Sequence, residues 1–125
     1  MAQAGNRARG QMAHHGGDAA ERRIARHYER LGYALAAARW RGPGGEIDLI
    51  LRRGGEVVFV EVKKSATIAG AAERIGPVQM ARIRLSAERF LDEEPLGQLT
   101  ESRFDVALMD AAGAFEILEN AFGQG

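Results

Sequence analysis

Two apolar runs separated by a pair of glycines lie in the middle of the chain. Residues 45–51 read Gly-Glu-Ile-Asp-Leu-Ile-Leu and residues 57–63 read Val-Val-Phe-Val-Glu-Val-Lys, with two charged residues two positions apart in each run. Such alternation is typical of β-strands, because successive side chains of a strand point to opposite faces. Gly54 and Gly55 between the runs predict a two-residue turn, so the two strands are expected to form an antiparallel hairpin.

The register that this turn predicts brings two acidic residues together. If the glycine pair forms the loop, Asp48 lies directly opposite Glu61, and the Cβ atoms of opposed residues are roughly 4.5–5.5 Å apart. Lys63 follows on the same face as Glu61, with Glu46 opposite it as its expected ion-pair partner. A shift by one residue would turn Asp48 toward the alternate valines of the second strand. Those valines suit a core, so we expect the first register.

Charges on strands that otherwise bury apolar side chains require a physical reason. Two carboxylates that can share one divalent cation, beside a lysine, are the ingredients of a site that cleaves phosphodiester bonds with Mg²⁺. Without a cation the opposed carboxylates repel each other, which raises the pKa of one of them. The alternative interpretation is a solvent-facing strand surface with an ordinary Glu–Lys pair.

Periodicity and turn residues predict the other elements. Apolar residues three and four positions apart predict helices over residues 18–31 and 77–91, the second with proline in its first turn. A turn is expected over residues 40–45, in which Trp40 caps the core in preference to stacking on a base. A loop or short helix is expected over residues 65–76. Further strands are expected over residues 33–39, 102–108 and 114–118.

Length and composition favour a single domain. The chain has 125 residues, enough for a modest core, and no cysteine, which excludes disulfides and thiolate metal sites. Residues 1–17 are rich in Gly, Ala, Arg and Gln and are expected to form a disordered arm before one domain over residues 18–125. No apolar run approaches the ~20 residues of a membrane span, and the arm lacks the apolar stretch of a signal peptide. We therefore expect a cytoplasmic protein without membrane association.

Five short stretches match a known family in order and spacing. They are residues 45–50 and 58–63, Ala20-Glu21, Leu31-Gly32-Tyr33 and Arg103-Phe104-Asp105-Val106. With these stretches, residues 18–122 resemble the YraN family, an uncharacterised family of the PD-(D/E)xK nuclease superfamily that is Holliday-junction-resolvase-like. The resemblance implies an α/β (α+β) fold with a restriction-endonuclease-like αβββαβ core, in which a mixed central sheet is flanked by helices.

The resemblance also implies roles for individual residues. Asp48 and Glu61 match the two metal-binding acids, with the carbonyl of Val62 as a further ligand of Mg²⁺ or Mn²⁺. Lys63 matches the lysine that positions or activates the attacking water. Glu21 matches an acid that some members of the superfamily supply from the first helix. Its helical position, beside the apolar stripe, allows this role, and the alternative is a glutamate that complements the helix dipole.

Charge distribution suggests a nucleic-acid partner. The formal net charge is zero, but residues 1–91 carry 16 basic against 9 acidic side chains, a net +7, and residues 92–125 carry 1 against 8, a net −7. A basic portion fits contact with phosphates, although oppositely charged sides with solvated arginines would give the same count. We expect the DNA to be branched or single-stranded and regard a homodimer as compatible with this function. The residues expected to contact DNA are Arg74, Gln79, Arg82 and Arg89.

One departure from the family pattern keeps a second hypothesis open. Gln79-Met80 stands where the resemblance has a Lys-Gln pair, so a polar or basic group is changed at the start of the second long helix. This favours a non-catalytic protein that binds nucleic acid or a partner on the same fold. The first hypothesis remains a metal-dependent endonuclease-like protein that acts on the phosphodiester bonds of DNA.

Overall fold

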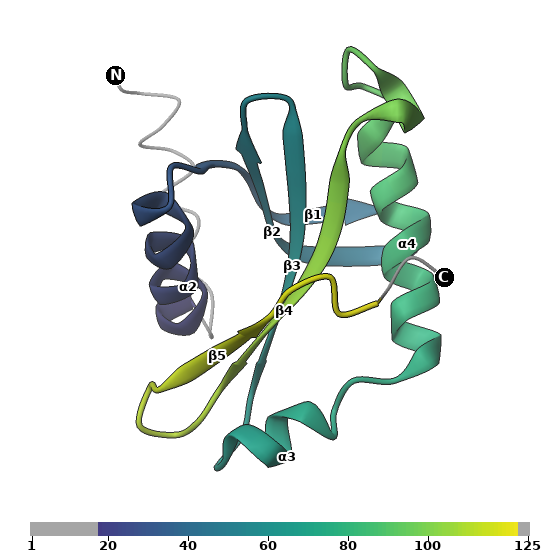
Figure 1. The fold of residues 1–125 in the computed structure, drawn as a ribbon. Coiled ribbons are helices and arrows are strands. Elements are labelled where there is room, and N and C mark those ends of the chain that lie inside the picture. The colour runs from purple at the N-terminus through teal and green to yellow at the C-terminus, as the bar shows by residue number, and fades with distance from the viewer. Residues whose placement is uncertain (1–17, 123–125) are drawn as a thin grey trace.

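The computed structural model describes residues 18–122 as a five-stranded mixed sheet with helices on both of its faces (Figure 1). It confirms the predicted α+β class and the order helix, three strands, helix, strand. The expected disordered arm, residues 1–17, lies outside the described residues. The elements are α2 (Asp18–Arg30), β1 (Ala34–Gly42), β2 (Gly45–Arg53), β3 (Glu56–Lys64), α3 (Ile68–Ala72), α4 (Pro77–Leu91), the 3₁₀ turn η1 (Gly97–Leu99), β4 (Ser102–Met109) and β5 (Phe115–Leu118).

The strands lie in the order β1-β2-β3-β4-β5. Among the strands that the structure describes, only β3 and β4 are parallel. The segment between them contains α3 and α4 and returns the chain to the other end of the sheet, whereas short turns join the antiparallel pairs. Leu49 is paired with Val60 and Arg53 with Glu56, which confirms the predicted register of the β2–β3 hairpin. Asp48 and Glu61 are the next positions in that register.

The central strand β3 is buried on both faces. Val58 and Val60 pack in the core that contains α2, while Val57 and Phe59 pack in the core that contains α4. Figure 1 shows α2 and α4 on opposite sides of the sheet. The valine face was correctly predicted as core, but the opposite face is also covered, as is usual for a central strand beside a parallel neighbour. Glu61 therefore lies on a covered face and not on a solvent-facing one.

The β1–β2 hairpin changes faces in its middle. Ala38 and its partner Leu49 pack on the α2 side of the sheet, but two residues further on Trp40 and its partner Ile47 pack on the α4 side. Strict alternation would keep residues two apart on one face, so both strands are irregular at the intervening positions. The tip of the hairpin is thereby turned under α4, where β1 and β2 are seen to run in Figure 1.

The predicted turn over residues 40–45 is too long. Strand β1 continues to Gly42, and only Pro43 and Gly44 form the turn, because the bent hairpin gains a partner in α4 that the sequence pattern did not reveal. Trp40 packs edge to face on Phe90 of α4, with ring centroids 5.3 Å apart, which confirms its expected core role.

A buried serine fixes the hairpin tip to α4. The Oγ of Ser86 donates to the carbonyl oxygen of Gly45 over 2.8 Å and accepts from the N–H of Gly44 over 2.9 Å. A Cβ atom at Gly44 would overlap the carbonyl oxygen of Arg82, which is backbone and cannot rotate away. The close approach of strand turn and helix therefore requires glycine at this position.

Substitution of Gly44 by alanine tests this contact. The added methyl group must push the hairpin off α4, and we expect a loss of about 1–3 kcal/mol in the free energy of unfolding. Gly55→Ala is the matched control, because a Cβ there meets nothing within 4 Å. Urea denaturation of both variants provides the measurement, and equal stabilities of the two variants would contradict the close contact between Gly44 and α4.

Candidate functional site

Asp48 and Glu61 lie where β2 and β3 separate. The last backbone pair of the two strands is Leu49 with Val60, and beyond it side chains replace the missing backbone partners. The Oδ2 of Asp48 accepts a hydrogen bond from the N–H of Val62 over 2.8 Å, and the Oε2 of Glu61 accepts one from the N–H of Asp48 over 3.3 Å. Each carboxylate is thus held by the backbone of the opposite strand.

Burial of the two acids shifts their ionisation. Glu61 is only 6% exposed, and burial together with the adjacent charge of Asp48 raises the pKa of Glu61 to about 8. Burial also raises the pKa of Asp48, although the Val62 N–H opposes that shift. The positive charge of Lys63 opposes the rise in the pKa of both acids, so three of the four predicted catalytic residues, Asp48, Glu61 and Lys63, lie close enough to interact electrostatically.

The donor set suits a hard cation that keeps much of its water. Among the described residues no three His, Cys, Asp or Glu side chains converge closely enough to hold a metal, so Asp48 and Glu61 are a pair of acidic side chains at this point. The carbonyl of Val62 is directed toward β2, as is the N–H of the same residue, because both groups of a strand residue face the same neighbour. Three protein oxygens completed by water match the preference of Mg²⁺.

Glu21 forms an ion pair with Arg39, which lies on β1 opposite Asp48. It lies buried on α2, 6% exposed, with its Oε2 3.3 Å from a terminal nitrogen of Arg39. The alternative role, a glutamate that complements the helix dipole, requires neither this burial nor an arginine partner. Arg39 also lies 3.6 Å from the Oε1 of Glu46. In the part of the chain that the structure describes, Glu46 therefore pairs with Arg39, and the predicted pair with Lys63 is wrong because the hairpin changes faces between the two positions.

Of the four predicted DNA contacts, Gln79 lies beside the acidic pair and Arg74 lies at the end of the strand that carries Glu61. Arg74 donates from a terminal nitrogen to the carbonyl of Lys64 over 2.6 Å, which fixes it at the end of β3. The amide of Gln79, in the first turn of α4, approaches the Oε1 of Glu61 at 3.5 Å. These two side chains can therefore contact the same substrate as Lys63.

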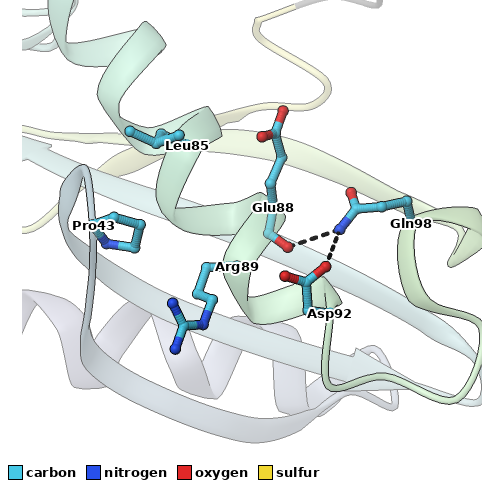
Figure 2. Close-up of a pocket in the computed structure, with 6 residues that line it drawn as sticks. All are labelled: Pro43, Leu85, Glu88, Arg89, Asp92 and Gln98. Carbon is cyan, nitrogen blue, oxygen red and sulfur yellow. Dashed lines mark hydrogen bonds between the residues drawn. The ribbon is translucent and has the colours of Figure 1, made fainter.

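The other two predicted contacts lie further along α4. A rise of 1.5 Å per residue places Arg89 about 15 Å from Gln79, with Arg82 between them. Arg89 lines a hollow of about 500 Å³ that includes two acids, Glu88 and Asp92 (Figure 2). The negative charge of these acids disfavours phosphate binding in the hollow. Arg89 is therefore both distant from the acidic pair and poorly placed to contact DNA. Arg82, in contrast, is exposed and lies one turn after Gln79.

A second group of buried polar residues was not predicted. Asp105 on β4 is 1% exposed and accepts from the hydroxyl of Tyr28 over 2.6 Å, from the Nε of Arg103 over 2.9 Å and from the N–H of Asn120 over 2.9 Å. Arg103 also pairs with Glu56 at 3.1 Å. This network joins α2 to β4 and to the start of β3, and so positions the helix that carries Glu21.

Removal of the Tyr28 hydroxyl tests the network. Tyr28→Phe takes a donor from a buried carboxylate, so we expect a loss of about 1–3 kcal/mol in the free energy of unfolding. Tyr33→Phe is the matched control, because its acceptor Glu56 is less buried and also has Arg103. Urea denaturation should show the larger loss for Tyr28, and a larger loss for Tyr33 would argue against this network as the anchor of α2.

The raised pKa of Glu61 predicts a pH-dependent stability. An unfolded glutamate ionises near pH 4.5, whereas Glu61 in the fold keeps its proton to about pH 8. Between these values the folded state binds more protons, so the free energy of unfolding falls as the pH rises and levels off above about pH 8.

Glu61→Gln removes this dependence, since the amide cannot ionise. We expect the stability of the variant relative to wild type to rise between pH 5 and pH 8, on the order of 1–3 kcal/mol. Glu93→Gln, at an exposed position, is the control and should follow wild type. Urea denaturation at several pH values measures this difference, and parallel curves for wild type and Glu61→Gln would refute it.

Comparison with known proteins gives consistent matches. The profile of the uncharacterised protein family UPF0102 matches residues 20–109, which include every candidate site residue. A UPF0102 protein of Ruegeria pomeroyi is 59% identical over 94% of this chain and 95% of its own length. UPF0102 proteins of Roseobacter denitrificans and Cereibacter sphaeroides are 57% and 58% identical, over 93% and 90% of this chain and 90% and 97% of their own lengths.

Proposed function

The chain belongs to the UPF0102 family, the YraN family that its motifs resemble, and we propose that it is a metal-dependent nuclease that cleaves phosphodiester bonds in DNA. The observation that carries this proposal is the pair of opposed acids where β2 and β3 separate, of which Glu61 is buried and Asp48 is half-buried. A protein that only needed a stable sheet would gain from apolar residues at both positions, because opposed acids that are partly or wholly removed from water repel each other. A divalent cation held between the two carboxylates would remove that repulsion, and the same pair of acids would then serve as its ligands.

The proposed mechanism assigns each group one task. Asp48 and Glu61, with the Val62 carbonyl, would hold Mg²⁺ or Mn²⁺, which supplies neutralising charge at the scissile phosphate and makes a bound water more acidic. Lys63 orients the attacking water and stabilises the negative charge that develops on the phosphate. The half-buried position of Lys63 restricts its motion and supports such an orienting role.

The substrate would be held mainly by its sugar-phosphate backbone. Arg74 is fixed at the end of β3, directly after Lys63, and Gln79 approaches from α4. Contacts of this kind fix the position of a strand without reading its bases, so they support affinity that does not depend on sequence. Branched and single-stranded DNA are the proposed substrate classes.

Cleavage assays test the proposal directly. Linear, single-stranded, flap and four-way-junction DNA are incubated with purified protein and Mg²⁺ or Mn²⁺. Asp48→Asn and Glu61→Gln should abolish cutting, because they keep the shape of the acids but weaken the metal site. Lys63→Ala should lower the rate by about 10²–10⁴-fold. Lys64→Ala, at the adjacent exposed position, is the control and should retain most activity.

The nuclease proposal requires cutting that is lost both when the metal is chelated and when Asp48 is replaced by asparagine. If no substrate is cut in this way, the proposal fails.

A second candidate function, that of a non-catalytic DNA-binding protein, is favoured by one contact. The amide of Gln79 approaches Glu61 and so offers the acid a partner without any metal. DNA affinity that is the same with and without Mn²⁺, and unchanged by Glu61→Gln, would support this second candidate.

A further inference from the structure

Arg39 has an unusual backbone conformation for a residue within a strand. Its φ is +52°, and among the described residues the only other non-glycine residue with positive φ is Asn120. Both side chains have a Cβ atom that this left-handed region disfavours. Asparagine compensates with a short polar group that can form a local hydrogen bond, whereas arginine has no such group. The conformation costs roughly 1–2 kcal/mol and persists only where the surroundings determine it.

The strained residue lies across the hairpin from Asp48. The pairs that flank it are Ala38 with Leu49 and Trp40 with Ile47, so the register places Arg39 opposite Asp48. This is also the point at which both strands change faces. The backbone of Arg39 therefore coincides with the bend that carries the first acid of the site.

The side chain of Arg39 joins the bend to α2. Its guanidinium lies 3.3 Å from Glu21 on α2 and 3.6 Å from Glu46 on β2, and the side chain is mostly buried. An arginine held by two acids on separate elements resists rotation of the strand that carries it. Both the left-handed backbone and the ion pairs thus act on the same point of the hairpin.

We propose that Arg39 is a positioning residue of the candidate site, which fixes the bend at which Asp48 leaves the sheet and thereby holds the Asp48 carboxylate on the N–H of Val62. Only the expected effect of Arg39 on metal binding rests on the proposed nuclease function. The position of Asp48 itself can be measured in protein without metal.

Two variants separate the backbone from the side chain. Arg39→Asn keeps a residue that tolerates positive φ but cannot reach both Glu21 and Glu46, and Arg39→Lys keeps a charge but loses the planar fork. Arg41→Asn is the matched control, because Arg41 lies two residues further on the same strand and is exposed. Urea denaturation gives the change in global stability for each variant.

Amide hydrogen exchange of Val62 in metal-free protein is the deciding measurement. In Arg39→Asn we expect the exchange rate of this amide to rise at least tenfold beyond the increase that the loss of global stability explains. The additional increase should be smaller in Arg39→Lys and absent in Arg41→Asn. Calorimetric titration with Mn²⁺ should show at least tenfold weaker binding by Arg39→Asn.

The outcomes distinguish this proposal from the proposed function. Exchange at Val62 that follows global stability in Arg39→Asn, or Mn²⁺ affinity within twofold of wild type, would overturn the positioning role. A raised KM for DNA with wild-type exchange would also overturn it and would assign Arg39 to the substrate. If the wild-type protein does not bind Mn²⁺, the proposed function fails, and exchange at Val62 still decides the role of Arg39.

Discussion

The separation of β2 from β3 at Asp48 and Glu61 is the constraint on which the rest of the site depends. A continuous ladder would leave no backbone N–H for either carboxylate, and two acids on a covered sheet face would then lack donors. Because the ladder stops at Leu49 and Val60, the N–H groups of Asp48 and Val62 become available to side chains. Glu61 is buried and Asp48 is half-buried, yet each keeps a hydrogen bond to a backbone N–H, and the two acids remain close enough to repel each other.

Contacts with α4 keep β2 apart from β3 beyond Asp48, whereas the two strands stay paired from Leu49 to Arg53. Past the bend, the tip of the β1–β2 hairpin is held on α4 by Ser86 and by the close approach of Gly44. Strand β3 continues in register with β4, which is parallel to it and carries the buried Asp105. One strand of the pair is therefore drawn toward α4 while the other stays in the sheet, and the opening between them is where the acids lie.

Local signals were sufficient to predict much of this arrangement. The glycine pair and the alternation of residues on both strands gave the register that places Asp48 beside Glu61, because a two-residue turn leaves little freedom in a hairpin. The second long helix followed from its apolar spacing and from Pro77. These features depend on residues close together in sequence, so one chain is enough to recognise them.

The features that were missed depend on contacts between distant residues. The left-handed backbone of Arg39 has no signature in an Ala-Arg-Trp sequence, and its partners on α2 and β2 are brought together only by the fold. The wrong partner for Glu46 has the same origin, since simple alternation cannot represent a change of faces. Asp105 lacked a predicted role because two of its donors, Tyr28 and Asn120, come from α2 and from the segment after β5.

The balance of charge is the reason that we propose a divalent cation, and not a further basic side chain, between the two acids. Arg39 divides its charge between one acid on α2 and one on β2, so its effect on Asp48 is partly cancelled. Lys63 acts on Asp48 and Glu61 together, and one positive charge cannot balance two negative ones. The protein alone meets this imbalance by leaving a proton on Glu61 near neutral pH. A divalent cation would displace that proton and allow both acids to ionise. A second lysine carries only one positive charge and would compensate the two acids less completely.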